Sequence, residues 1–250
     1  MQVYLTLVRR ELGGYFASLT GYILIAAVLL LLGLSFVDML VKLNAEPTEA
    51  PLTEQFFVTV YFWFILLLTT PVITMRSFAL EKFSGTYETL MTSPVKDVQV
   101  VLAKFTGALL FYAITWLPLG LYLVLVRHYS NDPAVLNPIS LLTTFLGILL
   151  VGSLYISMGC FASSLTRSQV VAVMISFALG LGLFFLSLRS LMAAPGTGWP
   201  AGVFQFIAMT EHLEDFARGI VDTRCLVYYV TLSFFFLFLT LRVVESRRWR

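Results

Sequence analysis

Charged side chains are scarce in this sequence, and their scarcity excludes an ordinary water-soluble domain. Asp, Glu, Lys and Arg make up 12% of the 250 residues, whereas a soluble domain carries about 25%. Hydrophobic residues make up 59% of the chain, and the mean hydropathy is +0.89. Because this much apolar surface needs a solvent other than water, the composition predicts an integral membrane protein.

Histidine and cysteine are nearly absent. His128 and His212 are the two histidines, and Cys160 and Cys225 are the two cysteines. These residues form neither a zinc-binding pattern nor a disulfide framework. We therefore expect no metal site and no cofactor bound by this chain, and we interpret both cysteines as buried apolar residues.

The sequence also lacks the G-x-x-x-x-G-K-[ST] loop that binds nucleotide phosphates. Transporters driven by protons or ions keep ionisable groups within the membrane, and the apolar runs described next hold almost none. If this chain moves a substrate uphill, ATP with its Mg²⁺ must be bound and hydrolysed on another polypeptide. The chain itself is then not an enzyme.

Six apolar runs are each long enough to cross a hydrocarbon core of about 30 Å as a helix. They cover residues 22–43, 57–75, 103–126, 140–161, 170–190 and 226–243. Asp38 and Lys42 lie near one end of the first run, and the apolar cores of the others carry no charge. The first run is longer than the apolar region of a signal peptide, about 7–15 residues, so we interpret it as a retained helix. The runs predict an all-α integral membrane protein with six transmembrane helices in a single domain over residues 1–250.

Basic residues are divided unevenly between the two sides that six spans define. Eleven Lys and Arg residues lie on the side of the termini, and five lie on the other side. The positive-inside rule therefore predicts that both termini are cytoplasmic. We therefore expect a multi-pass protein with both termini on the cytoplasmic side of its membrane.

Residues 2–18 precede the first run and carry an apolar stripe at helical spacing, made of Tyr4, Val8, Leu12 and Tyr15. Arg9, Arg10 and Glu11 lie off that stripe. The pattern predicts an amphipathic helix in the inner membrane interface. The alternative is an ordinary basic flank that only sets topology.

External segments are predicted from the connections on the other side. The first, residues 44–55, contains Pro47 and Pro51 and is predicted to be irregular. The last, before the sixth run, is predicted to form an amphipathic or re-entrant helix that lies on the outer leaflet. Its apolar face consists of Val203, Phe206, Ile207, Leu213, Phe216, Ala217 and Ile220.

The polar residues of this last external segment are the candidate external site, namely Glu211, His212, Glu214, Asp215, Arg218 and Asp222. Glu214 and Arg218 are spaced for an i,i+4 ion pair. These are the residues that a membrane-embedded, lipid-modifying enzyme would need. Their helical spacing spreads them around a face, which favours solubility through ion pairs over catalysis.

A polar insert, "MRSFALEKFSGTYETLMTSPVKD" (75–97), separates the second and third runs on the side of the termini. Gly85 predicts a helix break, Thr86 can cap a short helix over residues 86–92, and Ser93-Pro94 predicts the start of the third helix. The second span would then overrun to about Ser84. Glu81 and Glu88 would lie about 10.5 Å apart on one continuous helix, which is too far for a shared-proton pair.

The residues of this insert resemble the type-2 permeases of ABC transporters, whose pattern is roughly E-[KR]-x-x-G-T-x-E-x-L-x-x-[ST]-P-[VI]. The turn "GCFASSLTRSQVVA" (159–172) is also similar to an inner loop of that family. The C-terminal part, "HLEDFARGIVDTRCLVYYVTLSFFFLFLTLRVVESRRWR", more narrowly resembles the permease of gliding-motility type ABC transporters. The resemblance covers nearly the whole chain.

The resemblance implies a permease subunit of an exporter, with the insert as the coupling helix that docks on the ATPase. Its coupling residues here would be Glu81, Lys82, Gly85, Thr86, Tyr87, Glu88, Leu90, Met91, Ser93 and Pro94. The implied partners are two ABC ATPase subunits and a second permease copy in a homodimer, with membrane lipid around them. An auxiliary envelope protein is a further candidate partner, and no nucleic acid is expected.

The substrate is left open by the sequence. Uncharged spans favour a lipophilic or lipid-linked substrate over a hydrophilic ion, and export is the direction that the resemblance implies. Two other functions stay open at this point. One is the lipid-modifying enzyme, and the other is a non-transporting envelope scaffold or a component that transmits force.

Overall fold

The computed structural model describes residues 2–45, 52–86, 95–130, 137–192 and 206–248, and every element in these ranges is a helix. Six segments are long and apolar enough to cross a membrane. They contain α2 (Leu19–Ala45), α4 (Val60–Thr74), α7 (Asp97–Ser130), α8 (Pro138–Leu165), α9 (Gln169–Met192) and α12 (Thr223–Arg248). The predicted class, an all-α membrane protein with six candidate spans, is confirmed.

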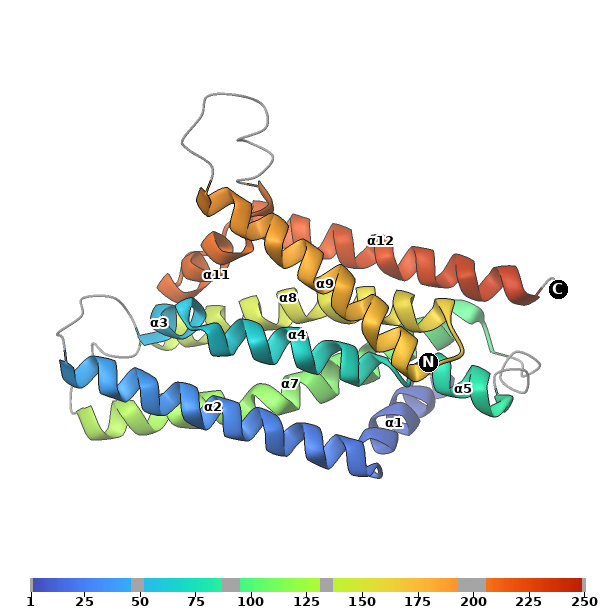
Figure 1. Cartoon of the computed structure of the whole chain (residues 1–250), viewed down its shortest axis with the longest axis horizontal. Helices are drawn as coiled ribbons and strands as arrows, with labels where there is room; N and C mark the ends of the chain where they lie inside the picture. The colour runs from blue at the N-terminus through green and yellow to red at the C-terminus, as the bar shows by residue number, and fades with distance from the viewer. Residues whose placement is uncertain (1, 46–51, 87–94, 131–136, 193–205, 249–250) are drawn as a thin grey trace.

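Four shorter helices lie at the two ends of this bundle (Figure 1). At the end that carries both termini, which we call the terminal end, lie α1 (Gln2–Phe16) and α5 (Ala79–Ser84). At the opposite end lie α3 (Leu52–Val58) and α11 (Met209–Arg218). This arrangement separates the predicted coupling insert from the predicted external helix by the full length of the bundle.

Helix α8 is the central element and packs against α4, α7, α9, α11 and α12. Small residues allow these close approaches. A Cβ added at Gly152 would lie 2.1 Å from the Tyr112 ring on α7, and one added at Gly159 would lie 2.1 Å from Thr74 Oγ1 on α4. Glycine at helix–helix contacts is typical of membrane bundles, where packing rather than water exclusion holds helices together. Gly152 and Gly159 thus serve contacts within the chain.

Helix α1 is not an isolated surface helix but packs along α7 and against the start of α2. Val8 is buried, and the hydroxyl of Tyr4 lies 2.7 Å from that of Thr106 on α7. Leu12 and Tyr15 also pack against the core, so all four residues of the predicted stripe face the bundle. Glu11 lies off the predicted stripe, but its carboxylate also points into the bundle, where it meets a buried cation of α7 described below.

The polar insert differs from its prediction at both ends. Helix α4 ends at Thr74, and a turn over residues 75–78 separates it from α5, so the second span does not overrun as one helix. Helix α7 begins at Asp97, after non-helical Val95 and Lys96, so Pro94 is not its first residue. An acidic residue in the first turn suits the positive end of the helix dipole. The break at Gly85 is confirmed, with a φ of +75° that favours glycine.

Two further boundaries changed. The first external connection is helical rather than irregular from Leu52, where α3 begins, because its Thr53 and Phe56 side chains are buried against the bundle. The third helix is longer than the predicted run over 103–126, since it spans Asp97–Ser130. Of the short helix predicted over residues 86–92, all but Thr86 lies outside the described residues, as does the predicted cap at Ser93.

Candidate functional site

The candidate site lies at the terminal end, where the α4–α5 turn meets α8. The backbone N–H groups of Phe78 and Ala79 both donate to the hydroxyl of Ser163 on α8, each at 3.1 Å. The first N–H groups of a helix have no partner within that helix, so Ser163 caps α5 from a neighbouring helix. Lys82 Nζ also donates to the carbonyl oxygen of Ser164. Two contacts with the end of α8 thus fix the position of α5.

The same turn is held from the other side by the junction of α1 and α2. The hydroxyl of Tyr15 donates to the carbonyl oxygen of Ile73 at 3.2 Å. Arg76 Nη1 donates to the hydroxyl of Thr20 at 2.7 Å. Burial raises the pKa of Tyr15, so this phenol stays a hydrogen-bond donor at any physiological pH. Hydrogen bonds therefore hold the turn on two sides, to the α1–α2 junction and to α8.

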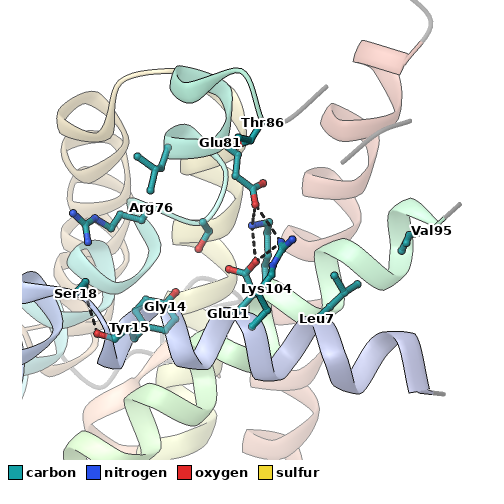
Figure 2. Close-up of a pocket in the computed structure, with 13 residues that line it drawn as sticks. Leu7, Glu11, Gly14, Tyr15, Ser18, Arg76, Glu81, Thr86, Val95 and Lys104 are labelled. Carbon is teal, nitrogen blue, oxygen red and sulfur yellow. Dashed lines mark hydrogen bonds and ion pairs between the residues drawn. The ribbon is translucent and has the colours of Figure 1, made fainter. Parts of the chain in front are cut away.

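A buried ammonium joins α5, α7 and α1 (Figure 2). Lys104, on α7, has a side chain that is 2% exposed. Its Nζ lies 2.7 Å from Glu81 Oε1 on α5 and 3.1 Å from Glu11 Oε1 on α1. The ammonium also lies 5.4 Å from the centre of the Phe78 ring. Arg10 approaches the same two carboxylates at 3.0 and 3.5 Å, so two cations and two anions form one network, which we call the Lys104 cluster.

The Lys104 cluster is suited to holding helices together rather than to acid–base chemistry. A general acid or base needs a carboxylate that is free to exchange its proton with a substrate, whereas here one ammonium binds both carboxylates. A buried ion pair adds little net stability compared with apolar packing, but removal of one partner leaves an unpaired charge and costs about 3–5 kcal/mol. The three helices are therefore strongly biased to keep this contact.

Not all of the predicted coupling residues point outward. Glu81 and Lys82 face the bundle, and their partners are Lys104 and Ser164. Gly85 and Thr86 are exposed at the tip of the insert. The remaining predicted coupling residues, Tyr87, Glu88, Leu90, Met91, Ser93 and Pro94, lie outside the described residues.

Sequence reasoning missed three residues that matter at this site. Lys104 lies near the start of the third apolar run, and Glu11 lies off the apolar stripe of α1, so neither position in the sequence indicates a buried contact. Phe83, near the end of α5, is 77% exposed and stands beside Gly85. A phenylalanine within a charged insert was the available signal for this last residue, since a solvated segment has no need of a large apolar side chain.

A cavity of about 730 Å³ opens beside the Lys104 cluster, between α1 and the α4–α5 turn. Figure 2 shows Glu81 and Lys104 on one side of it and Arg76 on the other. Apolar walls are supplied by Leu7, Leu80 and Val95. The cavity combines apolar walls with a few charged groups, which is the usual composition of a site for a small molecule or a lipid head group.

The predicted external helix is present as α11, and its apolar face is largely buried. Leu213, Phe216 and Ala217 are fully buried, whereas Phe206 and Ile220 are about half exposed. Helix α11 packs on α8 and α3, so it caps the end of the bundle. Val203 lies outside the described residues.

The charged residues of α11 do not converge on one point. Arg218 binds Glu54 of α3 through two hydrogen bonds of 2.6 and 3.0 Å, so the predicted pairing with Glu214 was wrong. Arg218 lowers the pKa of Glu54, and burial together with Glu54 raises the pKa of Glu214. Over the described residues, no three His, Cys, Asp or Glu side chains are grouped so that they could hold a metal ion.

His212 is the buried member of the predicted external site. Its Nδ1 lies 3.4 Å from the hydroxyl of Tyr229, and burial lowers its pKa although Asp215 and Asp222 oppose that shift. The ring also packs edge-on against Tyr228. Glu211, Glu214 and Asp215 are only partly buried. These three residues therefore lie along the partly exposed side of a helix that packs on the bundle.

Comparison with known families decides the class of this membrane protein. Residues 37–210 match the model of the ABC-2 family transporter protein, which is more than half of the 250 residues. This chain belongs to the ABC-2 transporter family. Proteins of that family are membrane components of transporters without an ATPase of their own, and they generally work with an ABC ATPase partner. A search of curated proteins gives no match. The gliding-motility subfamily stays a prediction from the C-terminal sequence.

Proposed function

We propose that this chain is the permease subunit of an ABC exporter and that its ATPase docks at the terminal end. The ABC-2 match and the six spans support the class of protein. The excess of Lys and Arg on the side of the termini supports a cytoplasmic terminal end. In this proposal the protein lies in a bacterial inner membrane as a homodimer with two ATPase subunits.

The observation that carries the proposal is the attachment of the polar insert to three other helices. Helix α5 is bonded to α8 through Ser163, to α7 through Lys104, and to α1 through the same Lys104 cluster. A force applied to the insert by a docked ATPase therefore reaches the interfacial helix and two spans through buried contacts. Rigid elements joined by buried networks are the physical basis for coupling distant sites.

The docking contact itself is assigned to the exposed tip of the insert. Phe83 is exposed there, and Gly85 and Thr86 follow it. The sequence that comes next supplies Tyr87, Leu90 and Met91 beside Glu88, a mixture of apolar and acidic side chains suited to a groove on a partner. The inward-facing Glu81 and Lys82 fix this tip in place.

The substrate in this proposal is lipophilic or lipid-linked. Apart from Lys104 and other residues near the helix ends, the described spans carry few charges that could line a hydrophilic path. An apolar molecule or a lipid tail can pass along such surfaces without the cost of burying a charge.

Co-purification with the cognate ABC ATPase tests the docking assignment. Glu88→Arg combined with Leu90→Asp should abolish co-purification and leave membrane insertion unchanged, because it reverses a charge and adds another at the predicted contact. Phe83→Ala should weaken co-purification, since a buried aromatic contact at an interface contributes about 2 kcal/mol or more.

The matched control is Phe64→Ala on α4, which removes a 54% exposed phenylalanine far from the insert and should leave co-purification at the wild-type level. Full retention of the ATPase by the Glu88→Arg, Leu90→Asp variant would show that the docking surface lies elsewhere.

A further inference from the structure

Two residues that line the cavity beside the Lys104 cluster each carry a buried polar atom without a hydrogen-bond partner in the protein. One is Arg76 Nε, a donor, and the other is Glu81 Oε2, an acceptor. Both residues line the cavity. Since a buried polar atom without a hydrogen bond costs about 1–3 kcal/mol, such atoms are normally satisfied. Because the residues that carry this donor and this acceptor line one cavity, they point to a ligand that can accept at one end and donate at the other.

The charge of the lining favours an anion. Three cations, Arg10, Arg76 and Lys104, and two carboxylates, Glu11 and Glu81, border the cavity, so three positive and two negative charges leave a sum of +1. Glu11 and Glu81 are already bound by Lys104 and Arg10, whereas Arg76 Nε has no hydrogen-bond partner. A phosphodiester is an anion of charge −1 whose oxygens match an arginine guanidinium.

The position and walls of the cavity favour a lipid over a soluble phosphate. Its lining includes Tyr15 and Ser18, at the junction where the interfacial helix α1 gives way to the first span. Leu7, Leu80 and Val95 supply apolar walls, and Val3 and Leu5 are exposed on α1. An amphipathic helix with exposed apolar groups lies at the depth of lipid head groups. The volume of about 730 Å³ is within the usual range for a ligand site.

We infer that this cavity binds the head group of a phospholipid, with its phosphate on Arg76 and a head-group N–H or O–H donor on Glu81. Phosphatidylethanolamine and phosphatidylglycerol both carry such a donor. Phosphatidylcholine has the same phosphate but only methyl groups on its nitrogen, so it leaves Glu81 Oε2 without a partner. The inference concerns the permease alone and does not depend on the proposed function.

Native mass spectrometry of the delipidated full chain in detergent tests the inference without any ATPase present. We expect phosphatidylethanolamine and phosphatidylglycerol to bind about tenfold or more tightly than phosphatidylcholine with the same acyl chains. Soluble glycerophosphoethanolamine should bind more weakly than the lipid because it has no acyl chains to pack against the apolar walls. Equal binding of all three lipids, or equal binding of the soluble head group, would overturn the assignment.

Two glycines on α1 offer a matched pair of variants. A Cβ added at Gly14, which lines the cavity, meets nothing within 4 Å, and the same is true of Gly13, which is not among the lining residues. Gly14→Phe should fill the cavity and abolish the preference for lipids with a donor, whereas Gly13→Phe should keep it. Wild-type lipid binding by Gly14→Phe would contradict the inference.

A second pair tests the phosphate contact. Arg76→Gln should weaken the binding of phosphatidylethanolamine and phosphatidylglycerol by about tenfold or more, because the charge-assisted contact to the phosphate is lost. Arg242→Gln removes the same charge from an exposed position on α12 that is not among the residues lining the cavity, and it should have no effect. Equal effects of the two substitutions would reduce the interaction to non-specific charge attraction and overturn the inference.

Discussion

The two ends of the bundle are closed by different kinds of contact. At the terminal end, α1, α5 and α7 meet around a buried ammonium beside a cavity of about 730 Å³. At the opposite end, α11 packs the fully buried Phe216 ring against Gly147 of α8, where an added Cβ would lie 3.1 Å from the ring. One end is held by charges around an open space, and the other is closely packed.

Hydrogen bonds to neutral hydroxyl groups, rather than buried charges, hold α11 at the opposite end. The last carbonyl groups of α11 accept from threonine hydroxyls of two neighbouring helices, Thr53 to Ala217 at 2.9 Å and Thr143 to Phe216 at 2.5 Å. These bonds satisfy groups that a helix end leaves open. Its ion pair, Arg218 with Glu54, lies at the surface, where such pairs contribute little. The comparison indicates that charge-assisted contacts hold the terminal end together, whereas close packing and threonine hydrogen bonds hold the opposite end.

The largest effect is expected from Lys104→Met. Removing the ammonium leaves Glu11 and Glu81 without their buried partner, which should lower the free energy of unfolding by about 3–5 kcal/mol. Thermal unfolding in detergent measures the loss. The triple variant Glu11→Gln, Lys104→Met, Glu81→Gln should recover most of it, because the one charge that remains in the cluster, Arg10, is 54% exposed and can be solvated by water. If the triple variant is as unstable as Lys104→Met, side-chain packing rather than charge pairing stabilises the terminal end.

A smaller effect is expected from Ser163→Ala. Two buried N–H groups, those of Phe78 and Ala79, lose their acceptor, which should lower the free energy of unfolding by about 1–3 kcal/mol. The exposed Ser246→Ala on α12 is the control and should change little. Protease cleavage within residues 75–86 should also become faster in Ser163→Ala. If Ser163→Ala has wild-type stability and is cleaved at the wild-type rate, the contact with α8 does not hold the insert in place.

The smallest effect concerns pH at the opposite end. Burial lowers the pKa of folded His212, so the unfolded state takes up more protons below about pH 6.5 and stability falls as the pH decreases. The raised pKa of Glu214 acts in the opposite direction nearer the carboxyl range. The melting temperature should therefore decrease between pH 7.5 and 6, and His212→Gln should show a flatter profile. Parallel profiles would mean that His212 is not a source of the pH dependence.

Features that depend on a single stretch of the chain could be predicted from the sequence. Long apolar runs predicted all six spans, because a helix in lipid must be both apolar and long enough to cross. The break at Gly85 followed from the conformational freedom of glycine. The amphipathic helices α1 and α11 followed from their periodicity.

What sequence reasoning missed depends on partners far apart in the chain. Lys104 and Glu11 are separated by 93 positions, and Arg218 and Glu54 by 164. No local pattern identifies such a pair. Lys104 lies near the start of the third apolar run, and i,i+4 spacing pairs Arg218 with Glu214 in its own helix. The turn after Thr74 was missed for the same reason, since Ser163 on α8 and Tyr15 on α1 hold it in place.

The central claim is that the Lys104 cluster makes the insert and α1 move together, and a distance measurement between them tests it most directly. Spin labels on the exposed Arg9 of α1 and Ser84 of α5 would report their separation in the complex with the ATPase, without nucleotide and with a non-hydrolysable ATP analogue. The account predicts one narrow distance distribution that is the same in both states, and a broadened distribution in Lys104→Met. A wild-type distribution in Lys104→Met would contradict the claim.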